Sequence, residues 1–192
     1  MKKFITILVL ILSLQSWTKA DDIRDFEIEG ISIGDSLLEY FSEKEIKKKI
    51  IDGYSSDKYL TIQFKKKHRN FKTYDAMHIN ILKNDKKMKI YALHGMKEYI
   101  DNIKGCKKEK TKIFEEINSL FKNARFEHIE KKHAQDESGK SFTDTNYIYL
   151  QSGDHVSIAC YDWSKEIGFK DHLRIAIVTK NFMDWINTEA YN

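Results

Sequence analysis

Short runs in which apolar and polar residues alternate constrain the fold of this chain more than any other feature. In residues 60–65, for example, Leu60, Ile62 and Phe64 are apolar and the residues between them are polar. This alternation predicts a strand with one buried side, because successive side chains point to opposite faces of a sheet. The same reasoning predicts strands at 26–31, 77–81, 88–92, 125–130, 147–150, 155–161 and 173–177.

Turns and helical segments between these runs indicate the fold class. Residues 84–85 and 152–154 have the composition of tight turns, and strands joined by such turns cannot be parallel. Ser42 and Glu45 have the spacing of a capping box, which starts a helix. Helices are predicted at 36–41, 42–51, 108–122 and 182–186, and a polar loop at 131–146. We therefore predict an α+β fold, a mainly antiparallel sheet with helices packed on one face.

The domain organisation follows from what the chain contains between these elements. No linker rich in Gly, Pro or Ser interrupts the sequence, so we expect one domain at 21–192. Each half places a helical segment before a set of strands. The chain can therefore also be described as two related α-then-β units, at 21–104 and 105–192.

The first twenty residues have the features of a secretory signal peptide. Lys2 and Lys3 supply positive charge, residues 4–14 form an apolar run of eleven, and Ala20 is a small residue suited to signal peptidase. A membrane-spanning helix requires about 20 apolar residues. We therefore expect cleavage after Ala20, a mature chain without a stable membrane span, and a periplasmic or secreted protein.

Removal of the signal peptide changes the charge balance. The whole chain carries 33 Lys and Arg against 29 Asp and Glu, a net charge of +4. The signal contains three lysines and no acidic residue, which leaves 30 basic against 29 acidic residues and a net charge of +1. A nearly neutral exported protein has neither the charge nor the compartment for a nucleic-acid partner, so we expect none.

The charge is unevenly distributed along the chain. Residues 43–112 contain 20 Lys and Arg but 9 Asp and Glu, a net charge of +11. Either the two parts of the chain neutralise each other on folding, or the basic residues form a face that attracts an anionic envelope component or an acidic protein. The residues predicted to form this basic face are Lys65, Lys66, Lys67 and Arg69, with further lysines at 83–89 and 104–112.

The chain has two cysteines, and an even number suggests pairing in an exported protein. Cys160 shares its side of a predicted strand with Val156 and Ile158, so it points into the core. Cys106 lies just before the predicted helix at 108–122. We predict a disulfide between Cys106 and Cys160, with two separate reduced thiols as the alternative.

The segment 161–172 has the composition of a binding site. It connects two predicted core strands and places the rings of Trp163 and Phe169 close to Asp162, Asp171 and His172 in the sequence. Aromatic rings beside polar groups are typical of sites for sugars or peptides. The alternative is that these rings cover the sheet edge or pack on the closing helix.

No pattern in the chain predicts a cofactor or a metal, and we assign no catalytic residue. Two Asp-His pairs, at 154–155 and 171–172, could meet in space as acid–base or metal-binding groups. An alternative function is a small hydrolase that uses Asp162, Asp171 and the neighbouring histidines, within residues 154–172. Such pairs are more often solvated turn residues.

Two segments have a familiar pattern. Residues 25–41, together with the sequence CYDWS at 160–164, resemble a family of small exported proteins of unknown function from alphaproteobacteria with AT-rich genomes. This resemblance implies a periplasmic setting and no particular activity. Residues 34–39 are similar to the start of small two-helix, three-strand domains in outer-membrane assembly lipoproteins, although this chain has no cysteine near Ala20 to carry a lipid.

Taken together, the sequence favours a non-enzymatic periplasmic module that binds a partner protein or an anionic envelope component. The polarised charge and the aromatic segment 161–172 support this hypothesis. A small hydrolase and a purely structural envelope protein are the alternatives.

Overall fold

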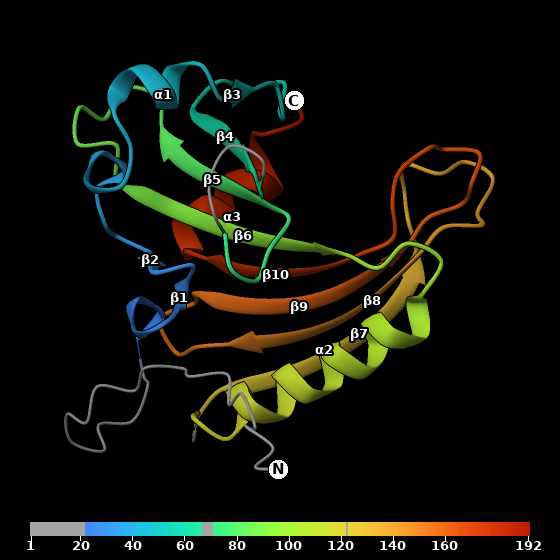
Figure 1. Cartoon of the computed structure of the whole chain (residues 1–192). Helices are drawn as coiled ribbons and strands as arrows, with labels where there is room; N and C mark the ends of the chain where they lie inside the picture. The colour runs from blue at the N-terminus through green and yellow to red at the C-terminus, as the bar shows by residue number, and fades with distance from the viewer. Residues whose placement is uncertain (1–21, 67–70, 122) are drawn as a thin grey trace, which may run out of the picture.

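The structure is a computed structural model that describes residues 22–66, 71–121 and 123–192 (Figure 1). The predicted signal peptide and its cleavage site lie outside these residues. The described helices are α1 (Glu43–Lys47), α2 (Ile103–Asn118) and α3 (Lys180–Thr188), with 3-10 turns at Ile23–Asp25 and Leu37–Glu39. The strands are β1 (Glu27–Ile28), β2 (Ile31–Ser32), β3 (Ile50–Ile51), β4 (Tyr59–Lys65), β5 (Ala76–Leu82), β6 (Ile90–Glu98), β7 (Arg125–Lys132), β8 (Phe142–Tyr149), β9 (His155–Asp162) and β10 (His172–Val178).

Eight strands form one antiparallel sheet in the order β3-β4-β5-β6-β10-β9-β8-β7, and β1 and β2 form a separate hairpin. The predicted α+β class with a mainly antiparallel sheet is confirmed. The order consists of two runs of four consecutive strands, β3–β6 and β7–β10, which meet through their last strands. β6 and β10 pair over seven residues, from Ala92 opposite Val178 to Glu98 opposite His172. Two α-then-β units would give this arrangement, and a relationship between them stays a prediction.

Alternation along the strands gives the sheet two chemically different faces. One face, called the core face below, carries buried aliphatic side chains that the register brings opposite one another, such as Ile158 and Ile175. The other face, called the open face, carries polar and aromatic side chains at the intervening positions. Among the residues of the open face are Gln63, His78, His94, Arg174, Tyr161, Thr145 and Lys131.

The helices cover both faces, which corrects the prediction that they pack on one face. α1 and α2 lie on the core face, where Ile46 and Cys106 join the main hydrophobic cluster. α3 lies on the other side of the sheet (Figure 1), where Phe182 and Trp185 pack on open-face residues of β4, β6 and β10. The N-terminal segments already fill the core face beside β4 to β6, so the closing helix buries its apolar side on the opposite face.

Several predicted boundaries also differ from the structure. α2 begins at Ile103, five residues before the predicted start, because the side chain of Asn102 caps it. Ile50 and Ile51 do not continue the preceding helix but pair with β4, as suits two β-branched residues. β7 and β8 pair from Lys132 outward, so the predicted loop at 131–146 shortens to 133–141.

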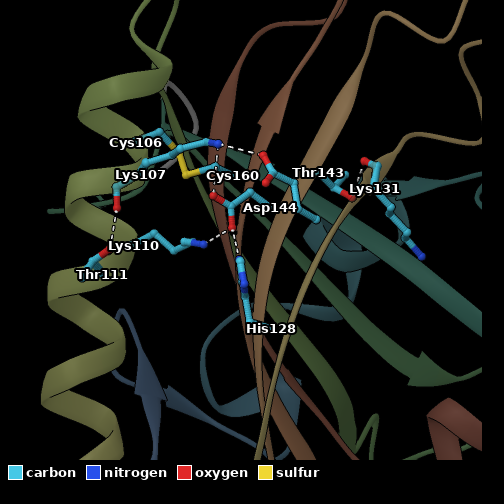
Figure 2. Close-up of polar contacts among 10 residues, drawn as sticks. Cys106, Lys107, Lys110, Thr111, His128, Lys131, Thr143, Asp144 and Cys160 are labelled. Atoms are coloured by element: carbon cyan, nitrogen blue, oxygen red, sulfur yellow. Dashed lines mark hydrogen bonds and ion pairs between the residues drawn. A yellow bond between two sulfur atoms is a disulfide. The ribbon is translucent and has the colours of Figure 1, made fainter.

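A disulfide and an ion pair hold α2 on the core face (Figure 2). Cys106 of α2 and Cys160 of β9 form the predicted disulfide. Their separation of 54 residues corresponds to a stabilisation of about 4 kcal/mol in the loop-entropy model. One helical turn after Cys106, the ammonium of Lys110 pairs with the Asp144 carboxylate, and the two side chains are 5% and 11% exposed.

The Asp144 carboxylate also contacts two other side chains in this region. Lys107 Nζ lies 3.4 Å from one carboxylate oxygen, and His128 Nε2 lies 2.9 Å from the other. Burial acts to raise the pKa of Asp144, but hydrogen bonds from Lys110 and His128 lower it overall. The carboxylate therefore stays charged and binds α2 to the edge strand β7 and its neighbour β8.

We predict that Lys110→Met destabilises the protein by about 3 kcal/mol, because Asp144 then lies buried without its main partner. Urea denaturation measures the change. Lys112→Met, on the exposed side of the same helix, is the matched control and should cost less than about 0.5 kcal/mol. In the Lys110→Met/Asp144→Asn double variant, the loss should be smaller than the sum of the single losses. Equal stability of the Lys110→Met and Lys112→Met proteins would contradict this account.

Candidate functional site

Arg174 lies near the centre of the open face. It is the third residue of β10, which is the fourth strand from one edge of the sheet and the fifth from the other. Its register partners are Met96 on β6 and Ala159 on β9. Because Leu173 and Ile175 point to the core, Arg174 between them must point to the opposite side.

The guanidinium of Arg174 is held by neutral groups. Nε and Nη2 donate hydrogen bonds to Nδ1 of His94, at 3.2 and 2.8 Å, and Nη1 approaches the Tyr161 hydroxyl at 3.4 Å. A guanidinium has donors only, so His94 Nδ1 must be the unprotonated acceptor nitrogen. No carboxylate in the described parts of the chain forms an ion pair with Arg174, which is only half-buried.

Other histidines surround this arginine and are kept neutral. Burial lowers the pKa of His94 well below its usual range, and Arg174 lowers it further. The pKa of His78 is lowered to about 4, mainly by burial and then by Arg174. His78 Nε2 lies 2.7 Å from the amide nitrogen of Gln63, which donates to it. The pKa of His172 is also lowered, again mainly by burial. Arg174 therefore supplies a full positive charge in this part of the face, whereas its histidine neighbours are uncharged near neutral pH.

A group of stacked rings adjoins Arg174 on the same face. The Tyr161 and His172 rings are cross-strand neighbours, 4.6 Å apart and nearly parallel. Trp163 also stacks with Tyr161, with the ring centres 5.8 Å apart. The rings of Phe169 and His133 contact Trp163 at 4.9 and 4.3 Å. Three of the five predicted site residues, Trp163, Phe169 and His172, are thus brought together.

The structure places the other two predicted site residues elsewhere. Asp162 points to the core face, into a pocket of about 200 Å³ that Asp144 and Phe142 also line. Burial and the Asp171 charge raise the pKa of Asp162. Asp171 is structural, because its carboxylate accepts a hydrogen bond from the Trp163 backbone at 2.8 Å. Neither carboxylate contributes to the group around Arg174.

The two Asp-His pairs do not meet. His155 pairs with Val178 at one end of the β9–β10 ladder, and His172 pairs with Tyr161 at the other end. Six residues of extended strand separate them, about 20 Å. A joint acid–base or metal site at 154–155 and 171–172 is therefore not formed.

The predicted basic residues are distributed over the sheet. Lys65 ends β4 on the open face, and the ammonium of Lys66 lies 3.7 Å from Asp75. Lys67 and Arg69 lie outside the described residues. The lysines at 83–89 follow the far end of β5, so they are separated from Lys65 by the length of that strand.

Sequence reasoning missed Arg174, His94 and His78, which come from three different strands. Arg174 does interrupt an apolar run, Leu173 to Val178, and that was the available signal. An arginine on the polar side of a strand is ordinary in itself. Its neighbours become known only when the register of β5, β6 and β10 is known.

We predict that the protein loses stability as the pH falls from about 6.5 to about 4. The unfolded chain binds protons at histidines with the usual pKa of 6.5, whereas folded His78 and His94 stay neutral in this range. The stabilisation that depends on these neutral histidines is therefore fully present above the pKa of histidine in the unfolded chain. It is lost as the pH falls below that value. His94→Asn keeps an acceptor near Arg174 and should reduce the slope by roughly 1 kcal/mol per pH unit. Urea denaturation at several pH values measures this, and an unchanged slope would refute the role of His94.

Comparisons with known proteins give no match: no family model, no curated protein and no solved structure matches the chain. Within residues 22–66, 71–121 and 123–192, no group of three or more His, Cys, Asp or Glu side chains is arranged to hold a metal ion. No helix in the same ranges is long and apolar enough to cross a membrane. What the open face offers chemically is a guanidinium fork without a carboxylate partner, a group suited to carboxylate, phosphate or sulfate.

Proposed function

We propose that the protein is an exported binding module that uses the open face around Arg174 to hold an anionic group of an envelope component. The observation that carries this proposal is the set of partners of Arg174, which are the neutral His94 and Tyr161 rather than a carboxylate. A half-buried guanidinium keeps most of its attraction for anions when only neutral acceptors orient it.

The setting of this function is the periplasm or the extracellular medium. The predicted signal peptide at 1–20 supports export. The buried Cys106–Cys160 disulfide supports it independently, because such bonds persist in oxidising compartments.

Binding is favoured over catalysis by the state of the groups around Arg174. Nδ1 of His94 is occupied by the guanidinium, so it is not free to accept a proton from a substrate. The Tyr161 and His172 rings stack on each other and are fixed in orientation. These contacts position the arginine and leave its charge uncompensated.

We expect Arg174→Gln to weaken the binding of small anions by roughly tenfold or more, because charge-assisted hydrogen bonds are lost. Calorimetric titration of the purified protein with galacturonate and with inorganic phosphate measures the affinities. Arg174→Lys keeps the charge but loses the fork, and it should give an intermediate affinity.

The matched control is Arg125→Gln, which removes the same charge from the same face. Arg125 is already paired with Glu127 at 2.9 Å, so its loss should change the affinity less than about twofold. The proposal fails if neither anion binds the wild-type protein, or if the Arg125 and Arg174 variants bind equally well.

A further inference from the structure

Two more cations on the open face resemble Arg174 in having no acidic partner among the described residues. Lys65 at the end of β4 and Lys131 on β7 point to this face, and both are exposed. Neither forms an ion pair with any residue that the structure describes. By contrast, Arg125 on the same face pairs with Glu127, and Lys66 beside Lys65 contacts Asp75. Among the described residues, the open face thus carries three cations without acidic partners.

The strand order spaces these three cations evenly across the sheet. Lys65 and Arg174 are three strands apart, and so are Arg174 and Lys131. With neighbouring strands about 4.8 Å apart, each interval is about 14 Å and the whole line is about 29 Å. Register places Lys65 and Arg174 in one row perpendicular to the strands, through Ala76 and Met96. Lys131 lies one same-face position beyond that row, which continues through Ala159 and Thr145 to Ile129.

The row between the cations is built from uncharged side chains. Ala76 and Met96 lie between Lys65 and Arg174, and the buried Ala159 and Thr145 lie between Arg174 and β7. Among the described residues, this row therefore holds no acidic side chain that would repel an anion. The α3 helix does not cover it, because its contacts are with Tyr59, Ala92 and other residues nearer the opposite strand ends.

Two histidines lie close enough to these cations for the charges to lower their pKa. The pKa of His78 is lowered by burial first, and by charges that include Arg174 and Lys65. The pKa of His133 is likewise lowered by burial, by Lys131 and by Arg174, while the Asp136 carboxylate acts to raise it. Each ring thus lies within the field of two of the three cations.

We infer that the open face binds a linear acidic polysaccharide, which lies across the strands and contacts Lys65, Arg174 and Lys131 together. This inference rests on the proposed function. It adds the chemical class of the ligand and its orientation across the strands. Cations spaced at about 14 Å can each pair with one carboxylate of an acidic chain that lies along the line. Polyphosphate carries charge but no hydroxyl groups for the neutral side chains between the cations. Hydroxyl and imidazole groups, from Tyr161 and His172 among others, can bond sugar hydroxyls between the charges.

The test uses oligogalacturonates of increasing length, titrated calorimetrically into the purified protein. Affinity should rise steeply with length until the oligomer spans about 29 Å, and then level off, because each added contact is intramolecular. Lys65→Gln and Lys131→Gln should each weaken the longest oligomer about three- to fivefold and leave the binding of monomeric galacturonate unchanged. Added salt should reduce the advantage of the long oligomers.

The matched controls are Lys132→Gln and Lys83→Gln. Lys132 follows Lys131 but points to the core face, and Lys83 is paired with Asp57 beyond the other end of β5. Both should bind long oligomers as the wild type does. Affinity independent of length, or equal effects of the test and control variants, would overturn the inference.

Three other outcomes show whether this inference fails alone or together with the proposed function. If Arg174→Gln abolishes galacturonate binding while length and Lys65 have no influence, the anion site stands and the polymer site falls. If polyphosphate of equal length binds more tightly than oligogalacturonate, the assignment to a polysaccharide is wrong. If no anion binds at all, the proposed function itself fails, and this inference fails with it.

Discussion

The antiparallel pairing of β6 with β10 is the interaction on which the rest of the molecule depends. It joins two four-stranded runs into one sheet, and among the described strands no other pair connects them. It also brings His94 of β6 within reach of Arg174 of β10. A shift of the register by one residue would turn one set of side chains to the core face and would separate the arginine from its acceptor. The same seven residue pairs therefore maintain both the fold and the candidate site.

From the alternation of apolar and polar residues, the sequence predicted where strands lie and which side of each is buried, and little beyond that. Leu60, Ile62 and Phe64 identify a strand and its buried side without knowledge of any partner. Which strands become neighbours depends on long-range pairing, which alternation does not encode. For this reason Asp162 and Trp163, adjacent in the sequence, were expected in one site although they point to opposite faces. Arg174 was passed over because its acceptor His94 lies 80 residues away.

The two faces of the sheet differ in the partners that their cationic side chains have. On the core face, the buried ammonium of Lys110 is matched by Asp144, as the cost of an unpaired buried charge requires. On the open face, Arg174 is oriented by the ring of His94, whose pKa burial lowers well below its usual range, and by the Tyr161 hydroxyl. A carboxylate in place of His94 would stabilise the arginine more strongly but would cancel its attraction for a ligand anion. The neutral acceptor is therefore the arrangement that keeps the guanidinium both fixed and available.

The two faces are mechanically connected through β9. Cys160 points to the core face, where the disulfide ties it to α2, while its neighbours Ala159 and Tyr161 point to the open face. Because adjacent residues of a strand share one backbone, a bond that immobilises Cys160 also fixes the positions of Ala159 and Tyr161. A surface fixed before binding loses less conformational entropy when a ligand arrives. The disulfide thus helps to fix the open face, which is the proposed binding surface, although it lies on the opposite side of the sheet.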